Sequence, residues 1–263
     1  MQKLTHKQYL HHLKRKKALI LLLQIGVLAV FLIVWELLAR FNVIDSFITS
    51  SPSKIVNTVI ELTKVGGLWR HVWVSTYETL VGFAIGTALG YAFAVVLWWN
   101  DLVKQVLEPY LVVLNSLPKI ALGPLIILWV GTGKASIIVM TILISVVITT
   151  ITILNGFCEV DGDKVMLLKS MEASKVQIFT KLVAPANVPT LLATLKINVG
   201  MSWVGSIMGE YLVSKEGLGY LLIYGAQTFR LDLVMTCTIV LCALAGVMYF
   251  GVALLEKHIG KKY

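Results

Sequence analysis

The chain has 263 residues, of which 57% are hydrophobic and only 14% are charged. A soluble domain of this length does not hide that share of apolar side chains from water, so the composition excludes the soluble classes and indicates a membrane protein with several spans. The formal net charge is +9 at pH 7. We assign this excess mainly to membrane topology, because Lys and Arg gather in cytoplasmic loops and attract anionic lipid, and we expect no nucleic-acid partner.

The first apolar run follows a basic segment. Residues 1–17 carry five Lys and one Arg, and residues 18–35 are free of charge. The run is long enough to cross roughly 30 Å of hydrocarbon. Because no small-residue cleavage site follows it, we predict an uncleaved first span with the N-terminus in the cytoplasm. Further on, Ser51 and Pro52 predict the start of an amphipathic helix over residues 55–62.

The second predicted span, residues 79–99, carries a regular series of small residues. Gly82, Gly86 and Gly90 recur every fourth position, which places them on one face of a helix. Such a face lets two helix backbones approach closely. The pattern predicts a packing face, with the partner either in the same chain or in a second copy.

The third apolar segment, residues 103–130, is interrupted by three prolines, the second of which is Pro118. Backbone groups freed by a broken helix are tolerated in a membrane only against protein or a water-filled cavity. Leu117, Pro118 and Lys119 should therefore face an interior surface or the membrane boundary, which makes them candidates to line or gate a pathway through the protein. The alternative is a boundary between a short interfacial helix and the third span, with Lys119 reaching to the headgroups.

Three further spans are predicted at residues 135–154, 188–209 and 233–255. The fourth is uncharged, and the fifth contains Lys196, which we expect to reach back toward the cytoplasmic boundary, together with Gly200, Gly205 and Gly209 at a packing spacing.

The turn that precedes the fourth span, residues 131–134, superficially matches a phosphate loop. Leu128 stands where that motif has its first glycine, and Ala135 stands where it has Ser or Thr. We expect no ATP site, metal or other cofactor in this chain.

Residues 160–189 form a polar interlude between the fourth and fifth spans. Apolar positions recur there at helical spacing, so we predict two short amphipathic helices, ended by Pro185 and Pro189. The segment either lies in the headgroups or docks a soluble subunit. Six spans place both termini and this lysine-rich segment on one side, which the positive-inside rule assigns to the cytoplasm and which favours docking.

Four blocks in a fixed order carry a family resemblance. They are SSPSKIV at 50–56, LNSLPKIALGPLIILWVGTGKAS at 114–136, the segment 160–189, and WVGSIMGEYLVSKEGLGYLL at 203–222. Together they resemble the membrane-spanning permease subunits of bacterial ABC importers of the nitrate, sulfonate and taurine type. The resemblance implies an all-α membrane fold of type I importers, with six transmembrane helices and a cytoplasmic coupling helix between spans four and five.

The coupling motif departs from the family pattern. Met166, Leu167 and Leu168 occupy positions that resemble the family's EAA, and Glu172 occupies that of its glycine. A glutamate there leads us to expect a continuous helix instead of a bend. The contacts with the ATPase that the resemblance implies are Lys169, Ser170, Glu172, Ala173, Ser174, Gln177 and Phe179.

The resemblance also implies an organisation and a function. Residues 1–17 would be a basic cytoplasmic segment, 18–256 a six-span permease domain and 257–263 a cytoplasmic tail in the bacterial inner membrane. Two copies would form the pathway for a small, anionic solute such as a sulfonate, taurine or nitrate. Two cytoplasmic ATPase subunits would drive transport, and an external binding protein would select the solute.

The outer end of the fifth span carries Glu210. This carboxylate is a candidate for gating the pathway or for contacting the binding protein. It could equally be solvated or ion-paired with Lys215.

An ion-gradient-driven secondary transporter is the main alternative. Such proteins place carboxylates or histidines at mid-membrane, whereas we expect Glu36, Glu78 and Glu210 near span ends and the five histidines outside the spans. An intramembrane enzyme is excluded by the lack of an H-E-x-x-H or G-x-S-x-G motif.

Overall fold

The computed structural model describes residues 6–45, 47–65 and 67–259. Within these ranges all regular structure is helical. The short helices η1 and η2 have 3-10 and π geometry, respectively. The elements in chain order are α1 (His6–Arg40), α2 (Pro52–Lys64), α3 (Leu68–Trp99), α4 (Asp101–Ser116), η1 (Lys119–Leu122), α5 (Gly123–Val130), α6 (Lys134–Cys158), α7 (Gly162–Ser170), α8 (Lys175–Ile178), η2 (Phe179–Val183), α9 (Ala184–Ala186), α10 (Val188–Val213), α11 (Leu218–Gln227) and α12 (Leu231–Ile259).

Five helices in the described part are long and apolar enough to cross a membrane, namely α1 from Ala18 onward, α3, α6, α10 and α12. A sixth crossing exists only if α4 and the η1–α5 segment are counted as one span, and these are bent by 90° at Leu117 and Pro118. The all-helical expectation is therefore confirmed, with five to six spans. The third predicted span is a broken one, as its prolines indicated.

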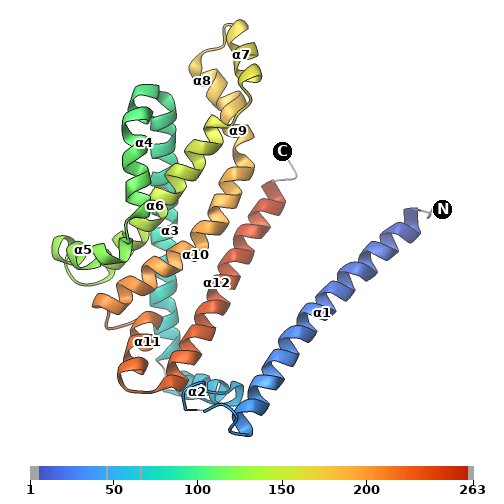
Figure 1. Ribbon diagram of the computed structural model, residues 1–263, viewed down its shortest axis with the longest axis vertical. Helices are drawn as coiled ribbons and strands as arrows, with labels where there is room; N and C mark the ends of the chain where they lie inside the picture. The colour runs from blue at the N-terminus through green and yellow to red at the C-terminus, as the bar shows by residue number, and fades with distance from the viewer. Residues whose placement is uncertain (1–5, 46, 66, 260–263) are drawn as a thin grey trace.

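The two ends of the molecule differ. Helices α7 and α8 lie at one end, and α2 and α11 lie at the other (Figure 1). The N-terminal end of α1 and the C-terminal end of α12 both point toward the α7–α8 end, as the sequence predicted for an even number of crossings. Of the basic termini, residues 1–5 and 260–263 lie outside the described residues.

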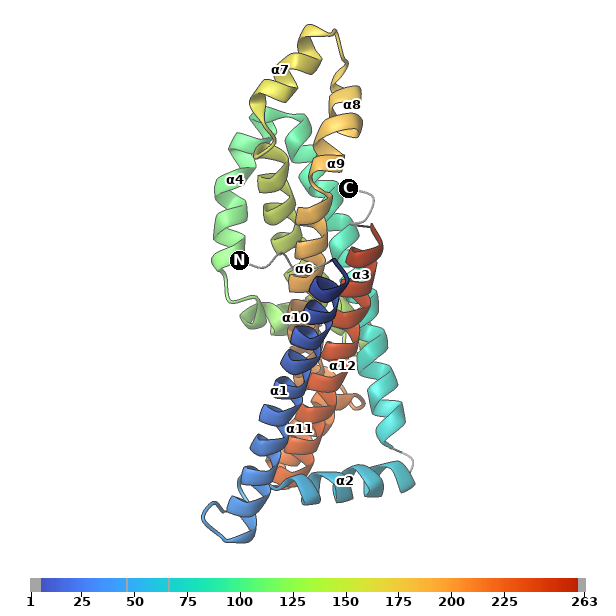
Figure 2. The same ribbon diagram turned by 90° about the vertical axis from the view of Figure 1, so that its right-hand side faces the viewer.

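The core is built where α3, α6 and α10 run side by side (Figures 1 and 2). The predicted glycine face of α3 packs on α6, within the same chain. A Cβ at Gly86 would lie 2.7 Å from Ser145 Cβ, and one at Gly90 would lie 2.5 Å from Thr149 Cβ. Since real Cβ atoms do not approach that closely, only glycine permits this helix spacing.

On α10 the glycine prediction holds in part. A Cβ at Gly205 would lie 2.8 Å from the Thr141 Cα of α6, and one at Gly209 would lie 3.0 Å from the Ile137 Cα. A Cβ at Gly200, however, would meet no atom within 4 Å in the described chain, so the predicted close packing is not found there within this chain. The cause is its place on the exposed side of the helix.

Small polar side chains join the same three helices in their buried interior. Such hydrogen bonds satisfy groups that lipid could not. The pairs are Thr79 Oγ1 to Ser206 Oγ at 2.8 Å, Ser145 with Ser202 at 3.0 Å, Asn198 Nδ2 to Thr149 Oγ1 at 2.6 Å and Asn198 Nδ2 to Thr87 Oγ1 at 3.1 Å.

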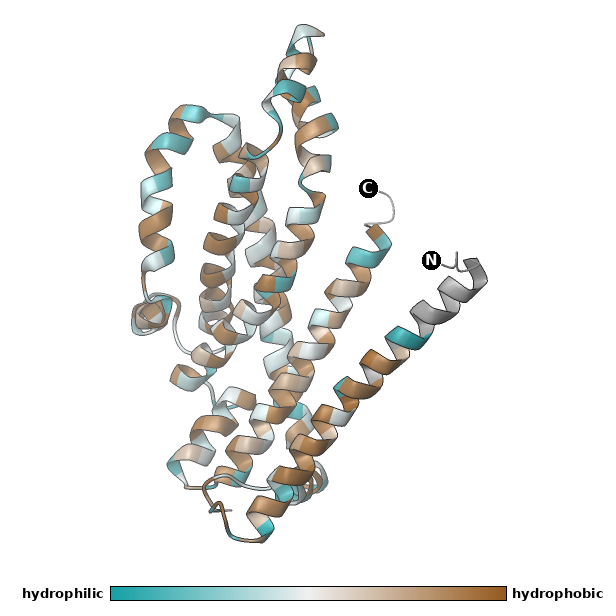
Figure 3. Cartoon of the chain, turned by 45° about the vertical axis from the view of Figure 1, so that its right-hand side comes forward, coloured by the Kyte–Doolittle hydropathy of each residue, from teal (hydrophilic) through white to brown (hydrophobic). Residues whose placement is uncertain are grey.

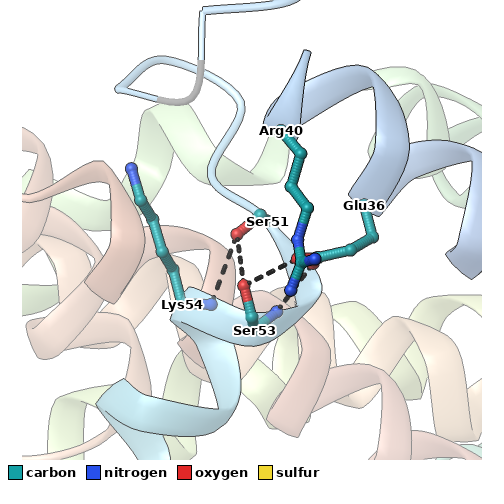
Figure 4. A network of polar contacts seen from close by, with 5 residues as sticks. All are labelled: Glu36, Arg40, Ser51, Ser53 and Lys54. Atoms are coloured by element: carbon teal, nitrogen blue, oxygen red, sulfur yellow. Dashed lines mark hydrogen bonds and ion pairs between the residues drawn. The ribbon is translucent and has the colours of Figure 1, made fainter. Parts of the chain in front are cut away.

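Helix α1 is held at an elbow with α2 (Figure 4). The Glu36 carboxylate accepts hydrogen bonds from Ser53 N at 3.1 Å, Ser53 Oγ at 3.0 Å and Arg40 Nε at 3.2 Å. Ser51 caps α2 by accepting from Lys54 N, and Pro52 starts the helix, as predicted. The elbow directs α1 away from the bundle, so that its apolar surface is exposed (Figure 3).

Candidate coupling segment and buried carboxyl pair

Two capped helices form the tip of the molecule, which we call the coupling segment (residues 160–189). Asp161 caps α7 by accepting from Asp163 N at 3.0 Å. Ser174 and Gln177 cap α8 reciprocally, with each side chain accepting the other residue's backbone N–H. The two short helices predicted from apolar spacing are therefore present.

The expected continuous helix at Glu172 is wrong, because α7 ends at Ser170 and Glu172 has a φ of +57°. Two backbone hydrogen bonds close the helix, from Glu172 N to Lys169 O and from Ala173 N to Leu168 O, both at 3.0 Å. A residue in left-handed conformation commonly ends a helix in this way, and glycine adopts it with the least strain. Glu172 thus adopts a conformation that glycine favours, and the chain bends there.

We predict that Glu172→Gly stabilises the bend, since it removes a left-handed non-glycine residue worth roughly 1 kcal/mol of strain. The gain is partly offset by the greater freedom of glycine in the unfolded chain. Hydrogen exchange at the Ala173 amide should slow slightly in this variant and accelerate in Glu172→Val, because a β-branched residue resists a positive φ. Faster exchange in Glu172→Gly would contradict the assignment.

The expectation that Pro185 and Pro189 end the helical pattern is wrong. Pro185 lies in the first turn of α9 and Pro189 in the first turn of α10, where the missing N–H needs no partner. The chain therefore runs from α8 into the span α10 with a single turn at Asn187, whose Nδ2 donates to Ile153 O of α6 at 3.1 Å. This connection joins the coupling segment directly to a membrane helix.

The predicted ATPase contacts fall into two groups. Five are exposed at the tip, and the other two, Ala173 and Phe179, are half-buried against the core. The Phe179 ring centroid lies 5.1 Å from that of Trp98 and 5.4 Å from that of Phe157. Phe179 is thus placed to anchor the segment on α3 and α6. The exposed five are Lys169, Ser170, Glu172, Ser174 and Gln177.

Sequence reasoning missed four apolar side chains at this tip. Met166, Leu167, Met171 and Val176 are 70%, 60%, 70% and 55% exposed. Large apolar side chains that cluster on a projecting polar segment mark an interface. The signal was present in the sequence, since Met166 and Leu167 were noted as departures from the family pattern but not as contacts.

Leu117, Pro118 and Lys119 lie where α4 bends into η1, and Leu117 is 42% exposed. The Lys119 ammonium donates to Asn115 O and to Asn115 Oδ1, both at 3.3 Å. Lys196, by contrast, forms an ion pair with Glu256 of α12. The charge of Lys196 is therefore neutralised locally, whereas Lys119 is held by hydrogen bonds to uncharged groups of α4.

Glu210, the fourth gate candidate, is fully buried, so neither a solvated carboxylate nor an ion pair with Lys215 describes it. Gly219 N, in the first turn of α11, donates to Glu210 Oε2 at 2.6 Å. Glu78 is also fully buried, because α3 begins at Leu68, well before the predicted start of its span. His71 belongs to α3 as well. Glu210 therefore lies near the end of its span, as expected, whereas Glu78 lies well inside α3. The expectation that all five histidines lie outside the spans was wrong for His71.

In the described residues no group of three or more His, Cys, Asp or Glu is arranged to hold a metal ion. The site has two parts: an exposed tip that continues into a span, and a buried carboxyl pair near the opposite end.

The long apolar helices make the chain a multi-span membrane protein. Residues 86–262 match the family described as binding-protein-dependent transport system inner membrane component, and the chain belongs to that family. It is thus a multi-pass inner-membrane permease of an ABC importer and is not itself the ATPase.

Similar proteins support this conclusion. A probable ABC transporter permease protein of Haemophilus influenzae is 29% identical over 86% of this chain and 91% of its own length. The putative aliphatic sulfonates transport permease SsuC of Bacillus subtilis is 27% identical over 89% and 84%. The formylaminopyrimidine transport permease ThiX of Halalkalibacterium halodurans is 30% identical over 72% and 75%.

Solved structures show the same fold. The MetNI methionine ABC transporter in an inward-facing conformation has a chain with a TM-score of 0.63 and 20% identity, covering 73% of this chain and 95% of that one. At this identity the likeness shows the fold, and the family assignment rests on the sequence comparisons.

Proposed function

We propose that two copies of this chain form the translocation pathway for a small anionic solute of the sulfonate, taurine or nitrate class. Sulfonate and taurine permeases are among its relatives, at 27% and 23% identity. The ThiX relative makes a pyrimidine derivative the alternative solute class. Because an external protein selects the solute in binding-protein-dependent systems, the substrate class is tested by uptake and not by binding to this chain alone.

The α7–α8 tip is the proposed docking site for the ATPase, and its exposed apolar side chains are the observation that carries this assignment. The continuous path from α8 into α10 supports a lever, in which movement of the docked ATPase turns a span. The basic N-terminus and the shared direction of both chain ends support a cytoplasmic position for this tip.

The orientation can be tested with a cysteine at Lys164, an exposed position on α7, in a chain whose three native cysteines are replaced. A membrane-impermeant maleimide should label Lys164→Cys in inside-out vesicles only. A cysteine at Thr63, on α2, should be labelled in intact spheroplasts only. The reverse pattern would overturn the proposed topology.

The solute class can be tested in cells that lack the chromosomal gene and carry it on a plasmid. Uptake of labelled taurine, an alkanesulfonate, nitrate and formylaminopyrimidine is compared with and without the plasmid. The proposal expects gene-dependent uptake of taurine, the alkanesulfonate or nitrate, which carry a sulfonate group or are anions themselves. Gene-dependent uptake of formylaminopyrimidine alone would contradict the anionic class and leave the importer assignment intact.

A further inference from the structure

Glu78 of α3 and Glu210 of α10 meet inside the protein, near the N-terminus of α11. Both side chains are fully buried and interact directly with each other. Outside this pair, the described chain offers no hydrogen-bond partner to either oxygen of Glu78 or to Glu210 Oε1. Three carboxyl oxygens thus lack a hydrogen-bond partner, and the further donors beside the pair, the Ser75 hydroxyl and the Tyr220 N–H, act on Glu210 and not on Glu78.

Two ionised carboxylates cannot share such a position at low cost. Each would lose its hydration, and their charges would repel at short range. A single proton removes one charge and supplies the missing donor, so that the pair becomes one hydrogen-bonded unit. The partnerless oxygens are therefore those that a bound proton would satisfy.

The surroundings offer Glu78 no substitute for that proton. Among the buried residues of the described chain, Glu78 and Glu210 are the only ones whose side chains would be charged in water at neutral pH. Lys134, at the start of α6, is exposed, and the guanidinium of Arg70 is already paired with Glu216. The titratable groups that act on the pair from neighbouring elements are Lys134 of α6, Glu216 of the loop before α11, Tyr211 of α10 and Cys237 of α12.

The geometry also distinguishes the two carboxyls. Glu210 Oε2 accepts the Gly219 N–H at 2.6 Å, at a helix N-terminus where the helix dipole favours negative charge. A Cβ at Gly219 would lie 2.8 Å from Glu210 Cβ, so this close approach depends on glycine. Glu78 has no comparable donor within the described residues.

We propose that the Glu78–Glu210 pair is a proton-binding site, in which Glu78 carries the proton and its O–H donates a hydrogen bond to Glu210 Oε1. The charge of Glu210 in turn holds the N-terminus of α11 against α10, at the end opposite the coupling segment. Loss of the proton would leave two facing charges and loosen α11. Because the folded chain binds one more proton than the unfolded chain at neutral pH, its stability should fall as the pH rises.

The test is infrared spectroscopy of the purified full-length chain in detergent, at pH 7 and in both H₂O and D₂O. Wild type should show the carbonyl stretch of a protonated carboxylic acid with a deuterium shift. Glu78→Gln should lose the band, and the exposed control Glu159→Gln should keep it. Absence of the band in wild type, or its persistence in Glu78→Gln, would overturn the proposal.

A second variant keeps the test decisive if Glu78→Gln does not fold. Glu210→Gln should retain a shifted band, because the proton stays on Glu78. Loss of the band in Glu210→Gln would overturn the assignment of the proton to Glu78. Thermal unfolding provides an independent check, since the fall of melting temperature between pH 6 and pH 9 expected for wild type should be reduced in Glu78→Gln and unchanged in Glu159→Gln.

Discussion

Replacing Leu167 and Met171 together by aspartate should reduce the affinity of the ATPase subunit for this permease by about 100-fold or more. Buried apolar anchors at interfaces contribute about 2 kcal/mol or more each, and a carboxylate at the same position must also be desolvated. Both side chains are exposed, at 60% and 70%, so the change should leave the fold of the permease intact. Quantitative mass spectrometry of the copurified ATPase measures the loss.

The matched control is Lys164→Ser, which changes an exposed polar residue on the same helix α7. It should copurify the ATPase as wild type does. Equal recovery of the ATPase with the double aspartate variant and with wild type would remove the tip from the docking surface. Reduced recovery of the ATPase with both the double aspartate variant and Lys164→Ser would show that the structure of the whole segment is disturbed. The loss could then not be assigned to an apolar contact.

Gly90→Leu should destabilise the helix core. The first side-chain atom would lie 2.5 Å from Thr149 Cβ and 2.8 Å from Val146 O, so α3 and α6 must separate. Overpacking of this kind costs about 1–3 kcal/mol. Displacing Thr149 also strains its 2.6 Å hydrogen bond from Asn198, which is worth about 1 kcal/mol. Size-exclusion chromatography after stepwise heating in detergent should show a clearly lower midpoint of aggregation.

Gly200→Leu provides the control for Gly90→Leu. Position 200 also lies in a membrane helix, but a Cβ added there would meet no atom within 4 Å in the described chain. Its midpoint should stay close to that of wild type. If Gly90→Leu and Gly200→Leu lowered the midpoint of aggregation equally, the loss of stability would come from replacing glycine in general. The close α3–α6 contact would then not limit stability.

Most of the architecture could be predicted from the sequence. Uncharged runs located the spans, the glycine series of α3 located a packing face, and Ser51 with Pro52 located the start of α2, because these signals are local. The four motif blocks indicated the family that residues 86–262 match. The sequence also located the segment that forms the tip, residues 160–189, but its exposed apolar side chains were not identified as contacts.

The errors arose where tertiary structure decides. Glu172 reads as a helix former, but the bend is imposed by the helices on either side and a glutamate accepts the left-handed conformation. Pro185 and Pro189 read as helix ends, yet each falls in a first turn. Glu78 and Glu210 lie 132 positions apart in sequence, and only the packing of α3 on α10 brings them together in the interior. No local pattern could reveal that contact.

The most direct test of the account is solute uptake by proteoliposomes that contain the permease with its copurified ATPase and binding protein. Uptake should require ATP on the face that carries α7 and α8, should be lost in the Leu167→Asp/Met171→Asp variant, and should be unaffected by ionophores that collapse proton and sodium gradients. Uptake that proceeds without ATP and follows an ion gradient would contradict the central claim that this chain is driven by a separate ATPase docked at the coupling segment.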